Sequence, residues 1–335
     1  MEQKVMERIC RAVDSFRGKR IAVVGDLMLD AYTWGKVNRI SPEAPVPVVQ
    51  VTKRTICPGG AANVIRNIVS LGASAAAFGI VGDDIHGDDL RKLLDREGID
   101  PIGVLTDPDR PTTFKERIIA GSQQLLRLDD EQQNAVNEKI REQLCEKFGH
   151  YLKTVRPDAV ILEDYAKGLF SSEYAQRIVD LCSAENIPVT LDPNARNPLN
   201  LHHLTIMKPN RAEAYEIAGI PQPVTGNSLD SLKAVAAKIR REWQVKYLLI
   251  SLAEDGMALF MDDGSCDVIP TRAKEVFDVS GAGDTVIAAC TLALSVKDDP
   301  VQAAEIANYA AGVVVGKLGT ATVSAEELKK ALQQA

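Results

Sequence analysis

Short runs of β-branched and aliphatic residues alternate along the chain with segments of helical periodicity. From residue 20 onward the apolar runs include KRIAVVGD, AAAFGIVG, DAVILED, NIPVTLDP, LTIMKPN and KYLLISL, and helical segments fall near 60–71 and 87–97. This alternation is typical of βαβ units, in which helices cover both faces of a parallel sheet. It predicts a three-layer α/β/α sandwich whose sheet is mainly parallel.

The predicted strands end in polar or glycine-containing turns. These turns lie at residues 25–26 (GD), 163–164 (ED), 192–194 (DPN) and 208–210 (KPN). Right-handed crossovers bring the carboxyl ends of parallel strands to the same edge of a sheet, where ligands bind. The sequence therefore predicts a polar ligand site along that edge.

Two segments depart from this pattern. PEAPVPVVQVTK (42–53) and RPTTFKERIIAG (110–121) have the composition of extended chain without a following helix of their own. We infer a small β-sheet lid from segments near 32–54 and 109–127; ordinary surface hairpins are the alternative. Because no internal repeat, low-complexity tract or long linker occurs, we expect one domain over residues 1–335.

The composition is that of an ordinary globular protein, with 45% hydrophobic and 25% charged residues. Lys and Arg total 39 against 46 Asp and Glu, and the net charge of -7 disfavours nonspecific binding to nucleic acid or to an anionic membrane. The N-terminal segment is amphipathic and carries acids too early for a signal peptide. Six scattered cysteines without a CxxC pair indicate reduced thiols. We expect a soluble, cytoplasmic protein.

The segment DVSGAGDT (278–285) precedes an apolar helical run, VIAACTLALS. Glycines at 281 and 283 allow a tight turn that directs backbone amides at one point, where the helix dipole also favours an anion. Asp284 would lie in the first helical turn beside this anion hole and could accept a proton from an attacking alcohol. The alternative is a helix-capping Asp in a glycine-rich turn. The sequence contains no GxxxxGK[ST], so a Walker-type NTPase is not indicated. The first strand is not followed by GxGxxG, the fingerprint of a dinucleotide-binding site.

The segment KPNRAE (208–213) opens another predicted helix. Asn210 and Glu213 have the spacing of a capping box, which accounts for both residues structurally. The functional interpretation is that they hold Mg²⁺, directly or through its water ligands, and that Lys208 adds a positive charge nearby.

Two further motifs follow the first strand. GDLMLD places Asp26 and Asp30 just past the predicted strand end, where carboxylates suit sugar hydroxyls. PGGAAN combines Gly59 and Gly60, which allow close backbone approach, with the amide of Asn63 at the start of a helix. Each motif alone is weak, since loops also use these residue types for turn geometry.

Taken in order, these motifs resemble those of the ribokinase-like carbohydrate kinases, also called the PfkB family. The resemblance covers roughly residues 18–325 and includes GDxxxD, GGxxN (59–63), NxxE (210–213), SLAEDG (251–256) and DVSGAGDT (278–285). It implies the ribokinase-like fold and an ATP-dependent phosphotransfer to a sugar hydroxyl, with in-line geometry and Mg²⁺.

The resemblance also implies a role for each motif. The catalytic base would be Asp284, with an anion hole formed by Gly281, Ala282 and Gly283. Mg-ATP would be organised by Lys208, Asn210, Arg211, Ala212 and Glu213, with Asn210 and Glu213 as metal ligands and with Ser251, Gly256 and Asn308 near the nucleotide. The sugar pocket would be lined by Asp30, Gly59, Gly60 and Asn63. Many family members use a monovalent cation beside the anion hole, and here Asp278 and Ser280 stand where it would bind.

Within the family, GDLMLDAYTWGKVNRISPEAPVPVV and EDYAKG look like segments of bacterial heptose 7-phosphate kinases. That subfamily phosphorylates the C1 hydroxyl of D-glycero-β-D-manno-heptose 7-phosphate, toward the ADP-heptose of lipopolysaccharide core. Many of its members carry a nucleotidyltransferase half after the kinase, whereas this sequence ends at Ala335. We therefore expect a monofunctional kinase that needs a separate adenylyltransferase.

A phosphorylated substrate requires cations at its far end. The candidates near the lid are Arg39, Lys53, Lys115, Arg117, Arg127 and, in DYAKG, Lys167. Solvated lid charges are the alternative for each. Other functions also remain open: a kinase for fructose 1-phosphate, ribose or a nucleoside, or a non-catalytic sugar- or nucleotide-binding regulator. Exposed lid strands further suggest a homodimer.

Overall fold

The computed structural model describes residues 2–121, 123–223, 229–273, 275–297 and 299–334. Within these residues the main sheet has nine strands in the order β13-β12-β11-β10-β9-β8-β1-β4-β5. In chain order they are β1 (Arg20–Gly25), β4 (Ser74–Gly82), β5 (Asp100–Asp107), β8 (Ala159–Glu163), β9 (Val189–Asp192), β10 (Ile206–Met207), β11 (Tyr247–Ser251), β12 (Met257–Phe260) and β13 (Cys266–Ile269). All neighbours pair in parallel except β11 with β12 and β12 with β13.

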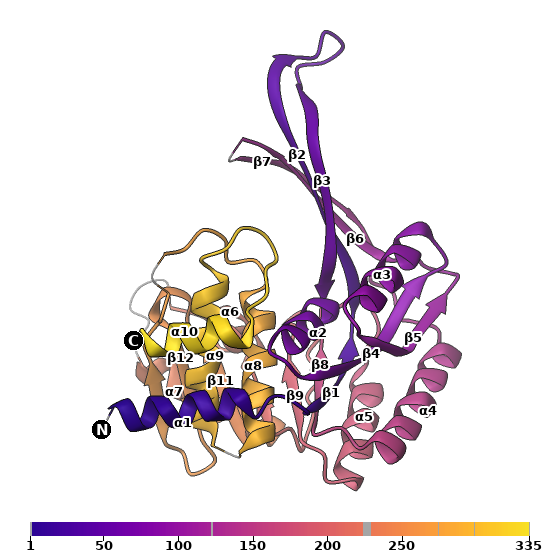
Figure 1. Cartoon of the computed structure of the whole chain (residues 1–335). Helices are drawn as coiled ribbons and strands as arrows, with labels where there is room; N and C mark the ends of the chain where they lie inside the picture. The colour runs from indigo at the N-terminus through magenta and orange to yellow at the C-terminus, as the bar shows by residue number, and fades with distance from the viewer. Residues whose placement is uncertain (1, 122, 224–228, 274, 298, 335) are drawn as a thin grey trace.

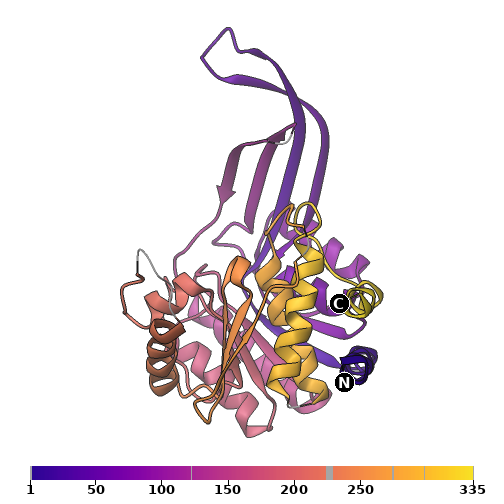
Figure 2. The ribbon, with the colours of Figure 1, turned by 90° about the vertical axis from the view of Figure 1, so that its left-hand side faces the viewer.

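Helices cover both faces of this sheet (Figures 1 and 2). One face carries α1 (Glu2–Asp14), α2 (Ala61–Ser70), α3 (Ile85–Arg96), α8 (Ala282–Val296), α9 (Pro300–Val314) and α10 (Ala325–Gln333). The other face carries α4 (Glu138–Val155), α5 (Ser172–Ala184), α6 (Arg211–Ile217) and α7 (Leu229–Trp243). A short 3₁₀ helix, η1 (Ala253–Asp255), follows β11.

The central strands show why the chain adopts three layers. In β1, Ile21 and Val23 belong to one buried apolar cluster, whereas Ala22 and Val24 belong to the other. Successive side chains of a strand point to opposite faces, so a continuous apolar run requires helices on both sides. The predicted α/β/α sandwich is confirmed.

A second sheet, which corresponds to the predicted lid, projects from the body (Figure 1). Its strand order is β3-β2-β6-β7, with β2 (Leu27–Ile40), β3 (Pro47–Gly60), β6 (Thr113–Ala120) and β7 (Gln123–Asp130). β2 pairs antiparallel with β3 but parallel with β6, so these strands form one sheet rather than separate surface hairpins. One detail of the prediction is wrong: β3 ends at Gly60 and α2 begins at the next residue, so this segment does have a helix of its own.

Among the described residues, no helix combines the length and apolar character needed to cross a membrane.

Candidate active site

Three acidic side chains meet at the carboxyl edge of the main sheet. Glu163 ends β8, Asp192 ends the adjacent β9, and Asp284 lies in the first turn of α8. One carboxylate oxygen from each of the three lies within 4.8 Å of the others. The predicted polar edge is therefore an acidic cluster built from three separate elements.

Asp284 is held by hydrogen bonds on both carboxylate oxygens. Asn63 Nδ2 donates to Oδ2 at 2.6 Å, and the Tyr165 hydroxyl donates to Oδ1 at 2.8 Å. Asp284 is only 5% exposed, and burial raises its pKa although both hydrogen bonds act to lower it. This carboxylate is oriented before any substrate arrives, and its raised pKa makes it a stronger base than a solvated Asp.

The glycines of the predicted anion hole allow close packing around this carboxylate. Gly281 has φ +78° and precedes α8, and a Cβ there would lie 2.8 Å from Asn63 Nδ2. A Cβ at Gly283 would lie 3.1 Å from Lys208 Nζ. Any larger residue at Gly281 would disturb the group that donates to Asp284. Ala282 begins the helix between the two glycines.

Asp278 braces the turn that leads into α8. Its carboxylate accepts hydrogen bonds from the Ser280 amide at 2.9 Å and from the Gly319 amide at 3.0 Å. Burial raises the pKa of Asp278, but these hydrogen bonds outweigh it and the pKa lies below its usual value. Asp278 thus connects the turn to the loop at Gly319.

One lysine partly balances the acidic cluster. Lys208 is 4% exposed, and its Nζ lies 2.8 Å from Asp192 Oδ2. Burial lowers the pKa of Lys208, but the charge of Asp192 outweighs it, and the pKa is raised. Burial, together with the charges of Asp192 and Asp284, raises the pKa of Glu163 well above its usual value. With three carboxyls and one ammonium group, full ionisation leaves uncompensated negative charge.

The cluster fits a divalent cation. Oxygen ligands are those that Mg²⁺ prefers, and Mg²⁺ is commonly shared between one or two carboxylates and substrate phosphates. Glu163 is 1% exposed, and its Oε2 is buried without a hydrogen-bond partner among the described residues. Such an orphaned oxygen suits a metal ligand, so Glu163 and Asp192 are the residues best placed to hold Mg²⁺.

Asn210 and Glu213 form the capping box that the sequence offered as the structural interpretation. Asn210 Oδ1 accepts from the Glu213 amide at 2.9 Å, and Glu213 Oε2 accepts from the Asn210 amide at 2.8 Å. Glu213 is still close enough for its charge to raise the pKa of both Asp192 and Lys208. In the same helix, Arg211 pairs with Asp255 at 2.6 Å and Ala212 is exposed.

Of the residues predicted near the nucleotide, Ser251 and Gly256 make close backbone contacts at the end of β11 and just after it, whereas Asn308 uses its side chain. The amide of Ser251 donates to the Pro209 carbonyl at 3.1 Å. Gly256 has φ +91°, and a Cβ there would lie 2.1 Å from the Ile269 carbonyl oxygen. Asn308 is 4% exposed and donates from Nδ2 to the Pro270 carbonyl at 2.6 Å. The side chain of Asn308 therefore braces the segment after β13.

The residues predicted to bind sugar divide into two groups. Asn63 is fully buried against Asp284, as described above. Asp30 is 6% exposed and pairs with Arg117 Nη1 at 2.6 Å, so Arg117 is engaged at the base of the lid. A Cβ at Gly59 would lie 2.3 Å from Asp30 Oδ2, and Gly60 has φ +55°. These glycines let β3 pass against Asp30 and turn into α2.

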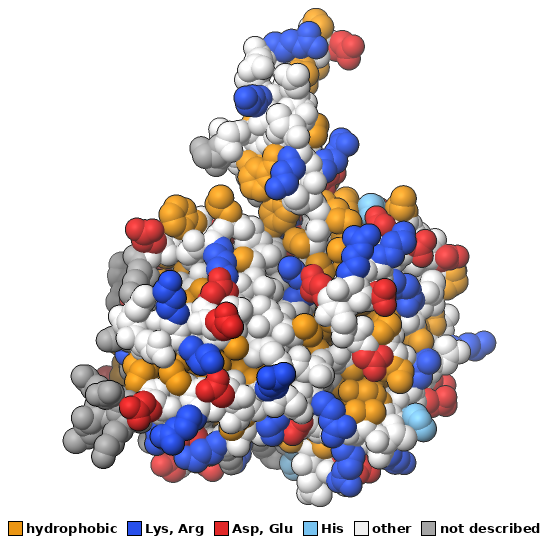
Figure 3. Space-filling view, in the orientation of Figure 1, with side chains coloured by type: hydrophobic (Ala, Val, Ile, Leu, Met, Phe, Trp, Pro, Cys, Tyr) orange, Lys and Arg blue, Asp and Glu red, His pale blue; other side chains and the backbone are white. Residues whose placement is uncertain are grey.

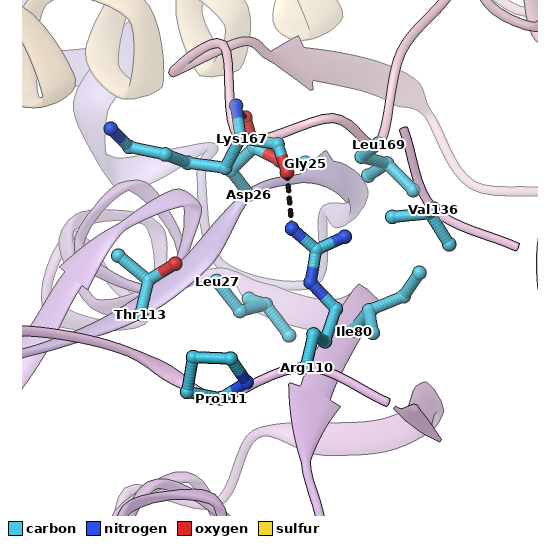
Figure 4. A pocket seen from close by; sticks show the side chains of 10 residues that line it. All are labelled: Gly25, Asp26, Leu27, Ile80, Arg110, Pro111, Thr113, Val136, Lys167 and Leu169. Atoms are coloured by element: carbon cyan, nitrogen blue, oxygen red, sulfur yellow. Dashed lines mark hydrogen bonds between the residues drawn. The ribbon is translucent and has the colours of Figure 1, made fainter. Parts of the chain in front are cut away.

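A pocket opens beside this region, between the body and the lid (Figure 4). Its lining includes Asp26, Arg110, Thr113 and Lys167. Arg110 Nη2 donates to the Lys167 carbonyl at 2.6 Å, and the Lys167 amide donates to Asp26 Oδ2 at 3.1 Å. Burial raises the pKa of Asp26. The pocket is therefore lined by charged groups from the residue after β1, the loop before β6 and the loop after β8.

Of the predicted basic residues, Lys115 and Lys167 converge on Glu131, at 2.5 and 2.7 Å. Arg127 instead pairs with Asp129, and its side chain is 52% exposed. Arg39 and Lys53 are exposed on the lid strands.

Sequence reasoning assigned no role to Glu163, Tyr165 or Asp192. Glu163 and Asp192 end their strands and Tyr165 lies two residues after β8, so all three lie at or just past strand ends that the pattern of apolar runs had already located. The available signal was therefore the position of ED, DYAKG and DPN at neighbouring strand ends.

Comparisons with known proteins identify the family and the fold. The family model described as pfkB family carbohydrate kinase matches residues 19–328. The bifunctional protein HldE of Sulfurimonas denitrificans is 40% identical over 311 residues, which cover 93% of this chain and 64% of that protein. HldE of Helicobacter pylori strain HPAG1 is 40% identical over 316 residues, which cover 94% of this chain and 67% of that protein. The chain thus spans about two thirds of the length of these relatives.

Two solved structures share the fold. The ribokinase of Arabidopsis thaliana complexed with ribose and ATP has a TM-score of 0.73 at 19% identity, covering 94% of this chain and 99% of that one. Phosphofructokinase-2 of Escherichia coli in complex with potassium has a TM-score of 0.75 at 19% identity. The match covers 95% of this chain and 99% of that one. The fold is ribokinase-like, and the chain belongs to the pfkB family of carbohydrate kinases, whose members are ATP-dependent sugar kinases.

Proposed function

We propose that this chain transfers the γ-phosphoryl group of ATP to the C1 hydroxyl of D-glycero-β-D-manno-heptose 7-phosphate, giving the 1,7-bisphosphate. The observation that carries the proposal is the buried carboxylate of Asp284, held by two donors at the glycine-rich start of α8. This arrangement places a base next to amides that favour an anion, as phosphoryl transfer to an alcohol requires.

In this mechanism Asp284 accepts the proton of the attacking hydroxyl. The hydrogen bonds from Asn63 and Tyr165 fix the plane of the carboxylate, so the hydroxyl meets a preoriented acceptor. The amides of Gly281, Ala282 and Gly283 lie at the start of α8, where the helix dipole favours the charge of the transferred group. The lid excludes water, which would otherwise compete as acceptor.

Glu163 and Asp192 are the residues proposed to hold Mg²⁺, with Glu213 nearby. When bound, Mg²⁺ neutralises charge on the transferred phosphoryl group. Lys208 already forms an ion pair with Asp192 and stays protonated there, so it keeps a positive charge at the same edge. Asp278 and Ser280 remain the proposed location for a monovalent cation.

The choice of sugar rests on two segments. Residues 25–49 and 163–168 resemble bacterial heptose 7-phosphate kinases, and these segments supply Asp30, Tyr165 and Lys167 to the site. The 40% identity with the HldE proteins supports the same choice.

The test is ATP consumption by the purified protein with Mg²⁺ and one sugar at a time. The panel contains D-glycero-β-D-manno-heptose 7-phosphate, its α anomer, ribose and fructose 1-phosphate. Preference for the β-heptose phosphate supports the proposal. Turnover of another sugar alone keeps the kinase mechanism but overturns the substrate, and ATP binding without any turnover indicates a regulator.

We also propose that the chain forms a homodimer through the lid. Beyond the segment where β2 pairs with β6 (residues 28–35), the hairpin of β2 and β3 extends as a two-stranded arm. Exposed apolar residues follow this arm, and Figure 3 shows them between basic side chains. An isolated hairpin with exposed edges is marginally stable, so a second copy would complete it. Sedimentation equilibrium tests this: a mass of one chain at micromolar concentration contradicts the dimer.

A further inference from the structure

Glu131 bridges two lysines that come from different parts of the molecule. Its Oε2 lies 2.5 Å from Lys115 Nζ on β6 of the lid, and its Oε1 lies 2.7 Å from Lys167 Nζ in the loop after β8. The three side chains are 14%, 10% and 16% exposed, in the order Lys115, Lys167, Glu131. Two largely buried ammonium groups thus point at one small volume between lid and body.

The site is built for an anion. Burial raises the pKa of Glu131, but the hydrogen bonds from both lysines outweigh it and lower the pKa to about 2. Lys115 also contacts Asp129 at 3.2 Å, and Asp129 is paired with Arg127. Lys167 has Glu131 as its carboxylate partner. A phosphate monoester, with about -1.5 to -2 charges and three terminal oxygens, matches two lysines better than one carboxylate does.

Its position fits the far end of the sugar. The loop that follows Glu163 carries Tyr165, whose hydroxyl contacts Asp284, and Lys167, which contacts Glu131. The same loop thus contributes one side chain to the catalytic carboxylate and, two residues later, one to the lysine pair. The pocket of Figure 4 is lined by Lys167 together with Arg110 and Thr113. A sugar held between these two points would have its reacting hydroxyl at Asp284 and its distal phosphate at the lysines.

The other basic residues near the lid are less well placed. Arg117 is committed to Asp30, and Arg127 is half exposed and paired with Asp129.

We propose that Lys115 and Lys167 form the subsite for the distal phosphate of the sugar substrate, and that Glu131 occupies this subsite until the phosphate displaces it. The proposal rests on the proposed function, because it requires a phosphorylated sugar. Lys115 belongs to the lid and Lys167 to the body, and Glu131 already links the two, so a bound phosphate would replace Glu131 as the link between lid and body.

The first experiment compares the heptose 7-phosphate with the same heptose lacking phosphate. Lys115→Met and Lys167→Met should each lower the ratio of kcat/KM for the two sugars by about 10- to 100-fold, mainly through KM for the phosphorylated one. Lys36→Met, an exposed lysine on the same lid, is the matched control and should leave the ratio unchanged. Glu131→Gln should lower KM for the phosphorylated sugar. Equal losses toward both sugars in the lysine variants overturn the subsite while leaving the proposed function intact.

The second experiment needs no turnover. Inorganic phosphate is titrated calorimetrically into the protein saturated with a non-hydrolysable ATP analogue and Mg²⁺, so that the anion hole is filled. The wild type should bind phosphate, with affinity reduced at least tenfold by Lys167→Met and increased by Glu131→Gln. Binding with this dependence supports the subsite even if the sugar panel shows no turnover. No phosphate binding by the wild type, or binding unaffected by Lys167→Met, overturns it.

Discussion

Replacement of Asp284 by Asn separates the chemistry of this residue from its structural contacts. In the wild type, Asn63 Nδ2 and the Tyr165 hydroxyl both donate to the carboxylate. An Asn side chain can keep its oxygen toward Asn63 and turn its amide toward Tyr165, whose hydroxyl can rotate to accept. The substitution should therefore preserve the local packing.

The substitution should leave the melting temperature unchanged or raise it, whereas it should lower the reaction rate. The charge of Asp284 raises the pKa of Glu163, so its removal relieves repulsion in a buried cluster and the melting temperature should stay the same or rise. Loss of a general base costs about 10²- to 10⁴-fold in rate, equivalent to roughly 3 to 5 kcal/mol in the activation barrier. We expect a folded protein with kcat reduced by that factor.

The assay is the initial rate of ATP consumption with Mg²⁺ and saturating sugar, beside a thermal melt of the same sample. Asp262→Asn, an exposed residue in the turn between β12 and β13, is the matched control and should behave as wild type. A variant at Asp284 that melts normally and keeps kcat within tenfold of wild type would refute the assignment of the base.

Three further predictions concern its neighbours. Tyr165→Phe removes a hydrogen bond that lowers the pKa of Asp284, so the acidic limb of the kcat/KM profile should move to higher pH and kcat should fall about tenfold. An acidic limb that stays at the wild-type pH contradicts the role of Tyr165 in setting the pKa of Asp284. The folded-state pKa of Glu163 is raised, so wild-type stability is lost as pH rises through it; in urea titrations, the gain from Glu163→Gln should therefore be larger at pH 8 than at pH 5. Arg117→Met leaves Asp30 buried without its partner and should cost roughly 3 kcal/mol of unfolding free energy, partly recovered by adding Asp30→Asn.

The sequence predicts the fold well because its signals are local. The apolar run of β1 and the glycine-rich start of α8 each express their structure within a few residues, and both lie where expected. The capping box of Asn210 and Glu213 is equally local, and the structure shows it.

The partners within the site were beyond that reasoning. Asp284 contacts Tyr165 and Asn63 because β8 lies beside β1 in the sheet and α2 packs against α8. The pattern of hydrophobic residues does not predict the order of strands in a sheet. The pairing of Arg117 with Asp30 likewise depends on parallel pairing of β6 with β2. The spacing of residues in the sequence predicts where the polar turns lie, whereas tertiary packing determines which of these turns contact one another.

Two motifs far apart in the chain act as one structural unit around the base. Gly60, at φ +55°, is the N-cap of α2 and so fixes the position of Asn63 in the first turn of that helix. Gly281 must lack a Cβ because that atom would lie 2.8 Å from the same Asn63 amide. The glycines of GGxxN therefore position the donor, and the first glycine of GAGD leaves room for it to reach Asp284. Gly281 thus serves the orientation of the Asp284 carboxylate, in addition to the anion-binding role that the proposed mechanism gives to its backbone amide.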